Sequence, residues 1–259
     1  MTEPMMFGDY ISFRVIRGRN LCLEGFNAIL GPSKIGHNCL IGLGSVIGYP
    51  SRPKLLNFIK KKGKSRLDET FNIFELDEIS EGTTIGNNCV IRGRAWIYEK
   101  TVLGSGIETG HNVMIRECVT VGNKTKIGTN TVIDGSISAE DGRIVIGDDV
   151  NIQSNVYIAA PVIIKNKVFI GPHVTFTNDR YPQSTLRSQI VVENGAIIGA
   201  NSTLIAGITI GSNSMVAAAS VVTKDVPEGW VVRGNPAQKH ISIEEYNKKR
   251  AHHEKRLKS

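Results

Sequence analysis

The sequence has 259 residues, of which 41% are apolar and 21% charged, with 27 glycines. This composition supports one large domain or two small ones with an apolar core, and it excludes a disordered chain and a collagen. No apolar run approaches the roughly 20 residues of a membrane-spanning helix, and residues 1–10 lack the basic start and apolar centre of a secretory leader. We therefore expect a cytoplasmic protein with no membrane partner.

The formal net charge of +7 favours anionic ligands in general. Part of it lies in a C-terminal tail whose charges solvation alone explains: Lys248, Lys249, Arg250, Lys255, Arg256 and Lys258. The charge therefore identifies no partner, and no nucleic-acid partner is predicted. Cys22, Cys39, Cys89 and Cys118 form no C-x-x-C pair, so we expect reduced thiols that act as small apolar side chains.

From residue 29 an aliphatic side chain recurs every six positions. The period holds, in chain order, at Ile29, Ile35, Ile41 and Ile47; at Ile79, Ile85, Ile91, Ile97 and Leu103; at Ile115, Val121, Ile127 and Ile133; in steps of six from Ile146 to Phe176; and in steps of six from Val192 to Val222. The step from Ile133 to Ile146 is 13 residues, one more than two hexads. We interpret it as a single-residue insertion.

Two further positions of the hexad are restricted. The fifth is small or β-branched, as at Cys39, Ser45 and Ser220, and the fourth is often Gly or Asn, as at Asn38 and Gly44. Glycine and asparagine tolerate left-handed backbone angles, which suits a corner. The period therefore predicts an all-β fold of short strands and corners, with three sides in an 18-residue coil and coils paired in parallel about 4.8 Å apart.

The first break in the period runs from about residue 49 to 77. It carries a basic group around Gly63: Lys60, Lys61, Lys62, Lys64 and Arg66. Two interpretations stay open, a solvated hairpin and a clamp on phosphate groups.

The second break, residues 177–190, begins with Thr177, Asn178, Asp179 and Arg180, and Pro182 prevents a simple continuation of the strand. The side chains of Asn178 and Asp179 could cap a turn of the backbone, or the loop could form a binding site. We favour the binding site.

At this point the chain resembles the hexapeptide-repeat acyltransferases. The repeat itself and the stretches FIGPHVTFTNDRYP (residues 169–182) and TGHNVMIRE (residues 109–117) are similar to enzymes that N-acetylate nucleotide-linked amino sugars. The resemblance implies a left-handed parallel β-helix, normally a homotrimer, with Asn178 and Asp179 at the sugar amine. The neighbours His173, Arg180 and Tyr181 are expected to bind the nucleotide-sugar substrate.

His111 is a second catalytic candidate, as a general base. Coil arithmetic separates it from Asn178 by about 17 Å along the axis at the 4.8 Å rise, so the two cannot contact one amine. We favour chemistry near Asn178, with the leaving thiolate taking the proton. His173 occupies a fourth position, where a structural corner role is equally open.

Acetyl coenzyme A is the expected acyl donor, and no metal is expected. Small residues in the final coils, Ala200, Ala217, Ala218 and Ser220, could let a slim pantetheine arm approach. The stretch VRGNPA (residues 232–237) resembles the G-x-P-A element that closes the coenzyme A site of the family. Pro236 lies in it, and Lys224, Arg233 and Lys239 could meet the phosphates.

Residues 242–256 read SIEEYNKKRAHHEKR, with acidic residues early and cations late, which predicts a short helix capping the open end. The expected organisation is a β-helix acyltransferase domain over residues 1–240 and a helix with a basic tail over 241–259.

The predicted function is acyl transfer from acetyl coenzyme A to the amine of a nucleoside-diphosphate amino sugar. One alternative is O-acetylation of a sugar or serine, which calls for a histidine base; Arg180 and Tyr181 precede Pro182 where such relatives carry that histidine. A zinc enzyme of the same fold is disfavoured because His111 and His173 lack a close histidine partner. A non-enzymatic scaffold protein is the remaining alternative.

Overall fold

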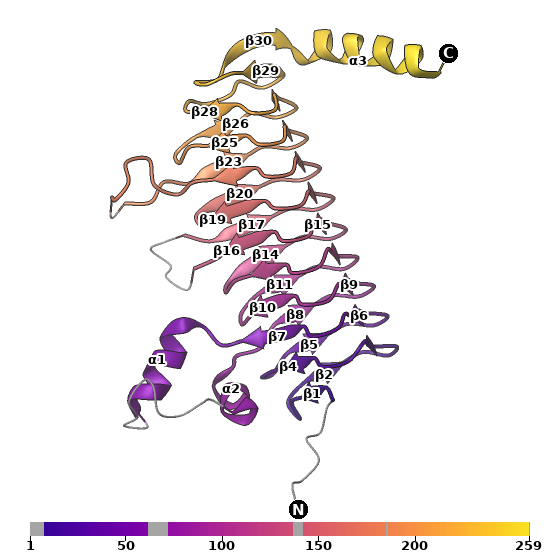
Figure 1. The fold of residues 1–259 in the computed structure, drawn as a ribbon, viewed down its shortest axis with the longest axis vertical. Helices are drawn as coiled ribbons and strands as arrows, with labels where there is room; N and C mark the ends of the chain where they lie inside the picture. Colours follow the sequence, from indigo (N-terminus) through magenta and orange to yellow (C-terminus); the bar gives the residue numbers. More distant parts are fainter. Residues whose placement is uncertain (1–7, 62–71, 137–141, 185, 259) are drawn as a thin grey trace, which may run out of the picture.

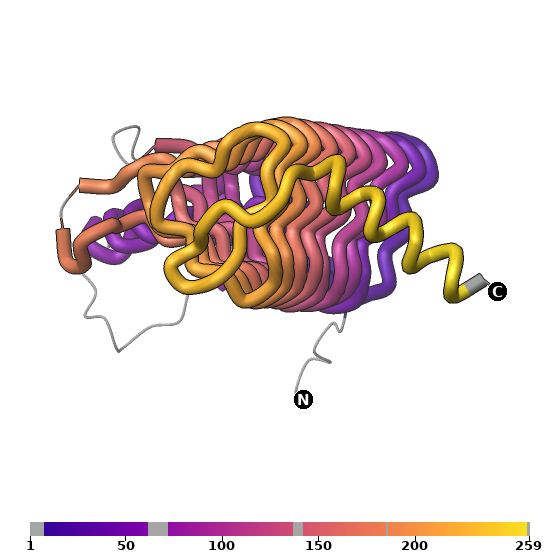
Figure 2. Tube along the Cα trace, turned by 90° about the horizontal axis from the view of Figure 1, so that it is seen from above, coloured from indigo at the N-terminus to yellow at the C-terminus, as the bar shows by residue number. Residues whose placement is uncertain are grey.

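The computed structural model describes residues 8–61, 72–136, 142–184 and 186–258, and its body is a parallel β-helix built from three sheets (Figure 1). Each of the first nine turns contributes one short strand to each sheet in the order A, B, C, and equivalent strands of successive turns pair in parallel; the tenth has no sheet B strand. We number the turns by their sheet A strand, from turn 1 at β1 to turn 10 at β28. Seen along its axis, the coil stacks turn upon turn (Figure 2).

The strands of each sheet have the following bounds. Sheet A contains β1 (Tyr10–Ile11), β4 (Ala28–Ile29), β7 (Val46–Tyr49), β10 (Trp96–Tyr98), β13 (Met114–Ile115), β16 (Val132–Asp134), β19 (Tyr157–Ala159), β22 (Thr175–Phe176), β25 (Thr203–Leu204) and β28 (Val221–Val222). Sheet B contains β2 (Ile16–Arg17), β5 (Lys34–Ile35), β8 (Thr84–Ile85), β11 (Val102–Leu103), β14 (Val119–Val121), β17 (Ile144–Ile146), β20 (Val162–Ile164), β23 (Ile190–Val192) and β26 (Thr209–Ile210). Sheet C contains β3 (Cys22–Leu23), β6 (Leu40–Ile41), β9 (Val90–Ile91), β12 (Glu108–Thr109), β15 (Lys126–Ile127), β18 (Asn151–Ile152), β21 (Phe169–Ile170), β24 (Ile197–Ile198), β27 (Met215–Val216), β29 (Trp230–Arg233) and β30 (Gln238–Ser242).

The hexad positions take the predicted places in this coil. Aliphatic first positions such as Ile41 and Ile158 are fully buried, and so are fifth positions such as Ser45 and Ser220. Fourth positions such as Asn38 have positive φ. A buried isoleucine contributes about 2 kcal/mol through the apolar surface it removes from water, so the stacked first positions supply most of the core.

All of the inserted segments leave the coil at one edge, between a sheet A strand and the following sheet B strand, which we call the AB corner. Residues 50–83 follow β7, residues 135–143 follow β16, and residues 177–189 follow β22. The CA corner, at the opposite edge of sheet A, and the BC corner connect their strands without such insertions in the described chain.

The first insertion contains α1 (Arg52–Lys61) and α2 (Ile73–Ile79), and both interpretations of it, a solvated hairpin and a clamp on phosphate groups, stay predictions. Asn72 and Glu75 form a reciprocal capping box that starts α2. Residues 62–71, which hold Lys62, Lys64 and Arg66, lie outside the described residues. Ile79, which was assigned to the repeat, ends α2 instead.

Two buried carboxylates fasten this insertion to the coil. Glu99 accepts hydrogen bonds from the backbone N–H of Ser51 at 3.0 Å and of Glu81 at 2.8 Å, and from Lys54 Nζ at 2.8 Å. Asp77 accepts from Ser12 Oγ at 2.9 Å and from the backbone N–H of Gly31. The helices are therefore held at the AB corner of turns 1 to 4.

The step from Ile133 to Ile146 is also different from the prediction. Ile133 lies in sheet A and Ile146 in the next strand of the same turn, in sheet B. Two such positions are ordinarily six residues apart, so the 13-residue step holds seven extra residues at the AB corner and not one. Residues 137–141 of this insertion are outside the described residues.

The coil also begins earlier than the sequence period indicated. Turn 1 starts at Tyr10, where β1 pairs with β4. Its sheet B inward position is Arg17, in register with the buried Ile35. This charged residue interrupts the aliphatic pattern between Ile11 and Leu23, both of which fit the period and pack against the core.

The C-terminal end is closed mainly by β30, which pairs antiparallel with β29. The helix α3 (Ile243–Lys258) then projects away from the coil (Figures 1 and 2). The helix is confirmed, but the cap is largely the β29–β30 hairpin. Among the described residues, no helix combines the length and apolar character needed to cross a membrane.

The cysteines are free thiols. Cys39 and Cys89 are buried at inward positions as expected, whereas Cys22 is exposed on sheet C. The predicted inward places of Cys39 and Cys89 are therefore confirmed.

Candidate active site

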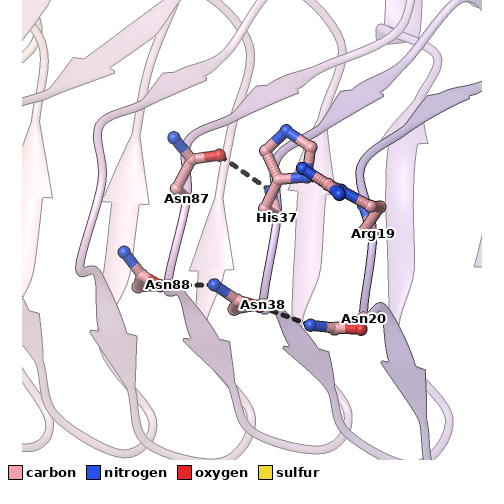
Figure 3. Close-up of a pocket in the computed structure, with 6 residues that line it drawn as sticks. All are labelled: Arg19, Asn20, His37, Asn38, Asn87 and Asn88. Atoms are coloured by element: carbon pink, nitrogen blue, oxygen red, sulfur yellow. Dashed lines mark hydrogen bonds between the residues drawn. The ribbon is translucent and has the colours of Figure 1, made fainter.

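The BC corner forms an open cavity of about 500 Å³, lined by Arg19, Asn20, His37, Asn38, Asn87 and Asn88 (Figure 3). Its polar groups bond to one another: the backbone N–H of Arg19 donates to His37 Nδ1 at 2.9 Å, and that of His37 donates to Asn87 Oδ1 at 2.8 Å. The same pattern continues through Ser105 and Asn123 in later turns. These side chains serve the coil as corner acceptors, so this cavity is structural.

The predicted histidines lie on the CA corner. His111 precedes β13 and is exposed, while His173 precedes β22 with a φ of 59°. His173 Nε2 is 3.4 Å from Asn155 Nδ2, the equivalent corner residue one turn earlier. The corner role of His173 is therefore confirmed, and its substrate role stays a prediction.

Most of the predicted acyl-donor residues share this CA corner. Ala200 and Ala218 lie there in turns 8 and 9, and Gly234 follows in turn 10, where it accepts a hydrogen bond from Val221 N. Arg233 and Pro236 flank Gly234 and are exposed. Small side chains here leave the backbone of the corner accessible to a narrow ligand.

Three of the predicted donor residues are placed differently. Ser220 points into the coil and is fully buried, donating to the carbonyl of Ala217 at 2.7 Å, so it is unavailable to a ligand. Lys239 Nζ lies 3.6 Å from the ring centroid of Trp230, in a cation–π contact. Lys224 lies on the AB corner, away from the others.

The 177–189 loop begins at the AB corner of turn 8. Asp179 uses both carboxylate oxygens within this loop: Oδ1 accepts from the backbone N–H of Tyr181 and Oδ2 from that of Ser184, each at 2.8 Å. The carbonyl oxygen of Asn178 accepts from Ser188 N at 3.1 Å. The turn-capping interpretation therefore applies to Asp179, whereas the side chain of Asn178 makes no hydrogen bond to other described residues.

Arg180 joins the loop to the next two turns. Its guanidinium donates to the carbonyl oxygen of Ala206 at 3.2 Å and to that of Thr223 at 2.9 Å. Tyr181 is 76% exposed at the loop surface. Arg180 is thus a loop anchor in this structure, and Tyr181 is free to meet a ligand or another chain.

A network of charged and phenolic side chains lies on sheet A beside this corner. Tyr157 Oη donates to Asp134 Oδ2 at 2.8 Å, and Arg116 donates to Asp134 Oδ1 at 2.6 Å. Arg116 also forms two hydrogen bonds to Glu117, whose side chain is 2% exposed. The network spans turns 5 to 7, on the corner after β13 and on strands β16 and β19.

Burial of the Tyr157 phenol, and next its hydrogen bond to Asp134, raise the pKa of this tyrosine to about 12. The nearby charge of Arg187 acts in the opposite direction on the same pKa. Since Arg187 belongs to the 177–189 loop, the loop and the network adjoin one another. Together they form a partly exposed polar site on an otherwise regular scaffold.

Aromatic side chains extend this site toward turn 3. Tyr49 packs edge-on against Trp96 and Tyr98, with ring centroids 5.1 and 5.2 Å apart. The guanidinium carbon of Arg116 is 5.9 Å from the ring centroid of Tyr98. This outer face of sheet A therefore offers flat apolar surfaces next to charged groups.

The structure does not bring the two predicted groups together within one chain. His111 and Asn178 lie at opposite edges of sheet A, and three steps of paired strands separate their turns. At 4.8 Å a step this is about 14 Å along the axis. The corrected insertion shortens the predicted separation slightly, and the conclusion that both residues cannot contact one amine is unchanged.

The sequence analysis overlooked Asp134 and Tyr157. Arg116 and Glu117 lie in the TGHNVMIRE stretch, of which only His111 was predicted to be functional. An available signal was the outward position of Asp134 next to Ile133, immediately before an insertion. Because the insertion was interpreted as a single residue, Asp134 was not recognised as the residue that precedes a long loop.

Family profiles match three parts of the chain. The profile described as "Bacterial transferase hexapeptide (six repeats)" matches residues 143–178, and "Hexapeptide repeat of succinyl-transferase" matches residues 32–50 and 189–224. The chain belongs to the hexapeptide-repeat transferase family. The matched segments consist mainly of regular turns.

Similar proteins are found at moderate identity. A bifunctional protein GlmU of Carboxydothermus hydrogenoformans is 28% identical over 220 residues, which cover 71% of this chain and 47% of that protein. The chain thus spans about half the length of this curated relative. A UDP-N-acetylglucosamine acyltransferase structure from Campylobacter jejuni has a TM-score of 0.56 at 16% identity, over 91% of this chain and 73% of that one, which supports the left-handed β-helix. An acetyltransferase of Vibrio cholerae O1 biovar eltor, solved with acetyl coenzyme A, is 33% identical over 48% of this chain and 70% of its own, at a TM-score of 0.41.

Proposed function

We propose that this hexapeptide-repeat chain transfers an acyl group, in the first instance acetyl, from acyl coenzyme A to the amine of a nucleoside-diphosphate amino sugar. The observation that carries the proposal is the partly exposed site at the AB corner, where the 177–189 loop adjoins Asp134 and Tyr157. The family description as a transferase, including succinyl transfer, supports acyl transfer as the reaction class.

The acceptor end of the reaction belongs to the AB corner. Acyl transfer to an amine needs a neutral nitrogen, aligned reactants and donors for the developing oxyanion. The side chain of Asn178, which has no hydrogen bond to other described residues, is available to orient the sugar. Asp179 supports it by fixing the shape of the loop.

The donor end belongs to the CA corner of turns 8 to 10. The small residues Ala200 and Ala218 lie there beside the exposed Arg233 and Pro236. This corner fits a slim chain followed by phosphates, because backbone groups are accessible and a guanidinium is close. Acyl coenzyme A, which we treat as a substrate, has these features.

Because the two corners are opposite edges of sheet A, we propose that each complete site forms between two copies of the chain. The AB corner of one copy would meet the CA corner of the next in a closed ring, for which a trimer is the proposed state. Head-to-tail contacts of this kind close into rings by rotation.

Transfer of the acyl group to a hydroxyl is the second candidate. The observation that favours it is the exposed His111 on the same CA corner as the donor residues, where it could act as a general base. Replacement of His111 by alanine separates the candidates, since a hydroxyl acceptor requires the base and a free amine does not.

The test mixes the protein with acetyl coenzyme A and a panel of nucleotide-linked amino sugars, their hydroxyl analogues and simple amino sugars. We expect release of free thiol with a nucleotide-linked amino sugar and with neither of the other groups. Thiol release with the hydroxyl analogues alone would favour O-acyl transfer. No release, together with no rise in melting temperature on adding coenzyme A, would indicate a scaffold protein.

A further inference from the structure

We infer that Asp134 is the carboxylate that receives the amino group of the acyl acceptor, with Tyr157 and Arg116 as its positioning residues. This inference rests on the proposed transfer to an amine. It assigns the contact with the amine to a strand residue in turn 6, two turns before the 177–189 loop. Asp179 then has a structural role in that loop.

The hydrogen bonds of the two aspartates distinguish them. Asp179 accepts from two backbone N–H groups of its own loop, which need both of its oxygens to keep the loop closed. Asp134 accepts from two side chains, Arg116 and Tyr157, that lie on the outer face of sheet A. Both carboxylates keep lone pairs, since each has about four acceptor positions. What separates them is that the bonds of Asp179 hold the loop backbone, whereas those of Asp134 orient a carboxylate on the outer face of the sheet.

The surroundings of Asp134 select a cation. Arg116 faces two carboxylates, Asp134 and Glu117, so the strand residues of the network carry one surplus negative charge. Tyr98 and Tyr157 add neutral phenols, and Arg187 approaches Tyr157 from the loop. Since Glu117 is buried and bonded twice by Arg116, the partly exposed Asp134 is the carboxylate that a bound ammonium group can reach.

The position of Asp134 is also well defined. It ends β16, in register with Ala159 of β19, and Arg116 follows the β13 residue Ile115 that pairs with Ile133. Groups on strands are held more accurately than groups on loops, and a bidentate pairing such as Arg116 with Glu117 fixes the guanidinium further. Tyr157 and Arg116 each bond a different oxygen of Asp134, which sets the plane of the carboxylate.

The reaction at this group can be written in full. The ammonium group binds to Asp134 and loses one proton to solvent, and the neutral amine keeps an N–H donated to the carboxylate. The nitrogen lone pair forms the C–N bond at the thioester carbonyl, and the C–S bond then breaks. The thiolate leaves with that electron pair and takes the second amine proton, so the products are an amide and a thiol. Asp134 orients the amine throughout and is not the base.

A nearby anion raises the pKa of a bound amine. Removing the charge of Asp134 therefore weakens acceptor binding and also lets the bound amine deprotonate at lower pH. The second effect separates direct contact from a purely structural role. A variant that only distorts the fold would not shift the acid limb of kcat against pH in a defined direction.

The experiment compares wild type with Asp134→Asn, Asp179→Asn, Tyr157→Phe and the surface control Glu108→Gln on sheet C, using acetyl coenzyme A and the best nucleotide-linked amino sugar. For Asp134→Asn we expect the acceptor KM to rise about 10- to 100-fold, the range of one charge-assisted hydrogen bond. The KM for acetyl coenzyme A should stay unchanged, and the acid limb of kcat against pH should move to lower pH. Tyr157→Phe should raise the acceptor KM several-fold and leave the acid limb in place.

The inference is overturned if folded Asp134→Asn, with the wild-type melting temperature, keeps both the acceptor KM and the acid limb. A larger acceptor KM for Asp179→Asn than for Asp134→Asn would overturn it as well. If Asp134→Asn does not fold, Tyr157→Phe decides, and an unchanged acceptor KM counts against the inference. Wild type that binds coenzyme A but acylates no amine overturns the proposed function, and the inference with it.

Discussion

Lys54 Nζ in α1 lies 2.8 Å from Oε2 of Glu99, a carboxylate that is 1% exposed at the AB corner of turn 4. The same oxygen accepts from the backbone N–H of Glu81, and the other oxygen from that of Ser51. One buried charge thus holds both ends of the first insertion. Such a group is costly to leave without partners, so its contacts fix the insertion in one position.

We expect Glu99→Gln to lower the free energy of unfolding by about 2 kcal/mol, since a buried charge pair loses one member while Lys54 stays partly exposed. Urea unfolding measures this change. Limited proteolysis should also cut the first insertion faster in the variant. The control is Glu81→Gln, whose exposed ion pairs with Lys54 and Lys100 are worth under about 1 kcal/mol. Equal effects of the two substitutions would contradict this account.

Tyr157 makes the free energy of unfolding depend on pH in the alkaline range. Its pKa in the folded protein is about 12, above the value near 10 of an unfolded chain. The neutral phenol is therefore favoured by folding, and its contribution is complete below pH 10 and is lost as the pH rises from about 10 toward 12. Urea midpoints measured across this range should fall more for wild type than for Tyr157→Phe. Parallel curves for the two proteins would refute the assignment.

Arg180 is expected to stabilise the loop and not the coil. Arg180→Ala removes the donors to the carbonyl oxygens of Ala206 and Thr223. The loop should then be cleaved several-fold faster by a protease, while the melting temperature changes little because the core is untouched. Tyr181→Ala is the matched control, since Tyr181 is exposed. A large drop in melting temperature for Arg180→Ala would show that the loop is part of the cooperative fold.

Phe176 ends β22, immediately before the 177–189 loop, and is fully buried. Phe176→Ala should cost about 3 to 5 kcal/mol, because it removes a large apolar side chain and leaves a cavity. Phe169→Ala, on the exposed face of sheet C, is the control and should cost far less. Urea unfolding distinguishes them, and similar losses for both would contradict the inward phase of the hexads.

The repeat predicted the coil because its inward positions recur without exception over most turns. Residues such as Ile41 and Ser45 obey the pattern, and so do the left-handed corners at Asn38 and Asn88. In turn 1, Arg17 occupies an inward register and interrupts the pattern. The insertion after Asp134 was misjudged because a 13-residue step fits either two hexads and one residue or one hexad and seven residues.

The site was less accessible to sequence reasoning than the coil. The position of the 177–189 loop was evident from the lost period, but the partners of Asp179 depend on the three-dimensional path of the loop. The Asp134–Tyr157 contact joins residues 23 positions apart in neighbouring turns. Asn178 and Ala200 lie at opposite edges of sheet A because Asn178 follows the sheet A strand β22 and Ala200 precedes the sheet A strand β25. The sequence alone did not assign the strands to sheets.

The most direct test of the central proposal is complementation between two impaired variants, Asp134→Asn at the AB corner and Ala218→Trp at the CA corner, assayed at an acceptor concentration below the wild-type KM. If one site draws on two copies, co-expressed variants form interfaces in which both corners are intact, at random about one in four. Thiol release with acetyl coenzyme A and the amino sugar should return to about a quarter of the wild-type rate, on the same basis. Mixed assemblies that are no faster than either variant alone would contradict a site shared between copies.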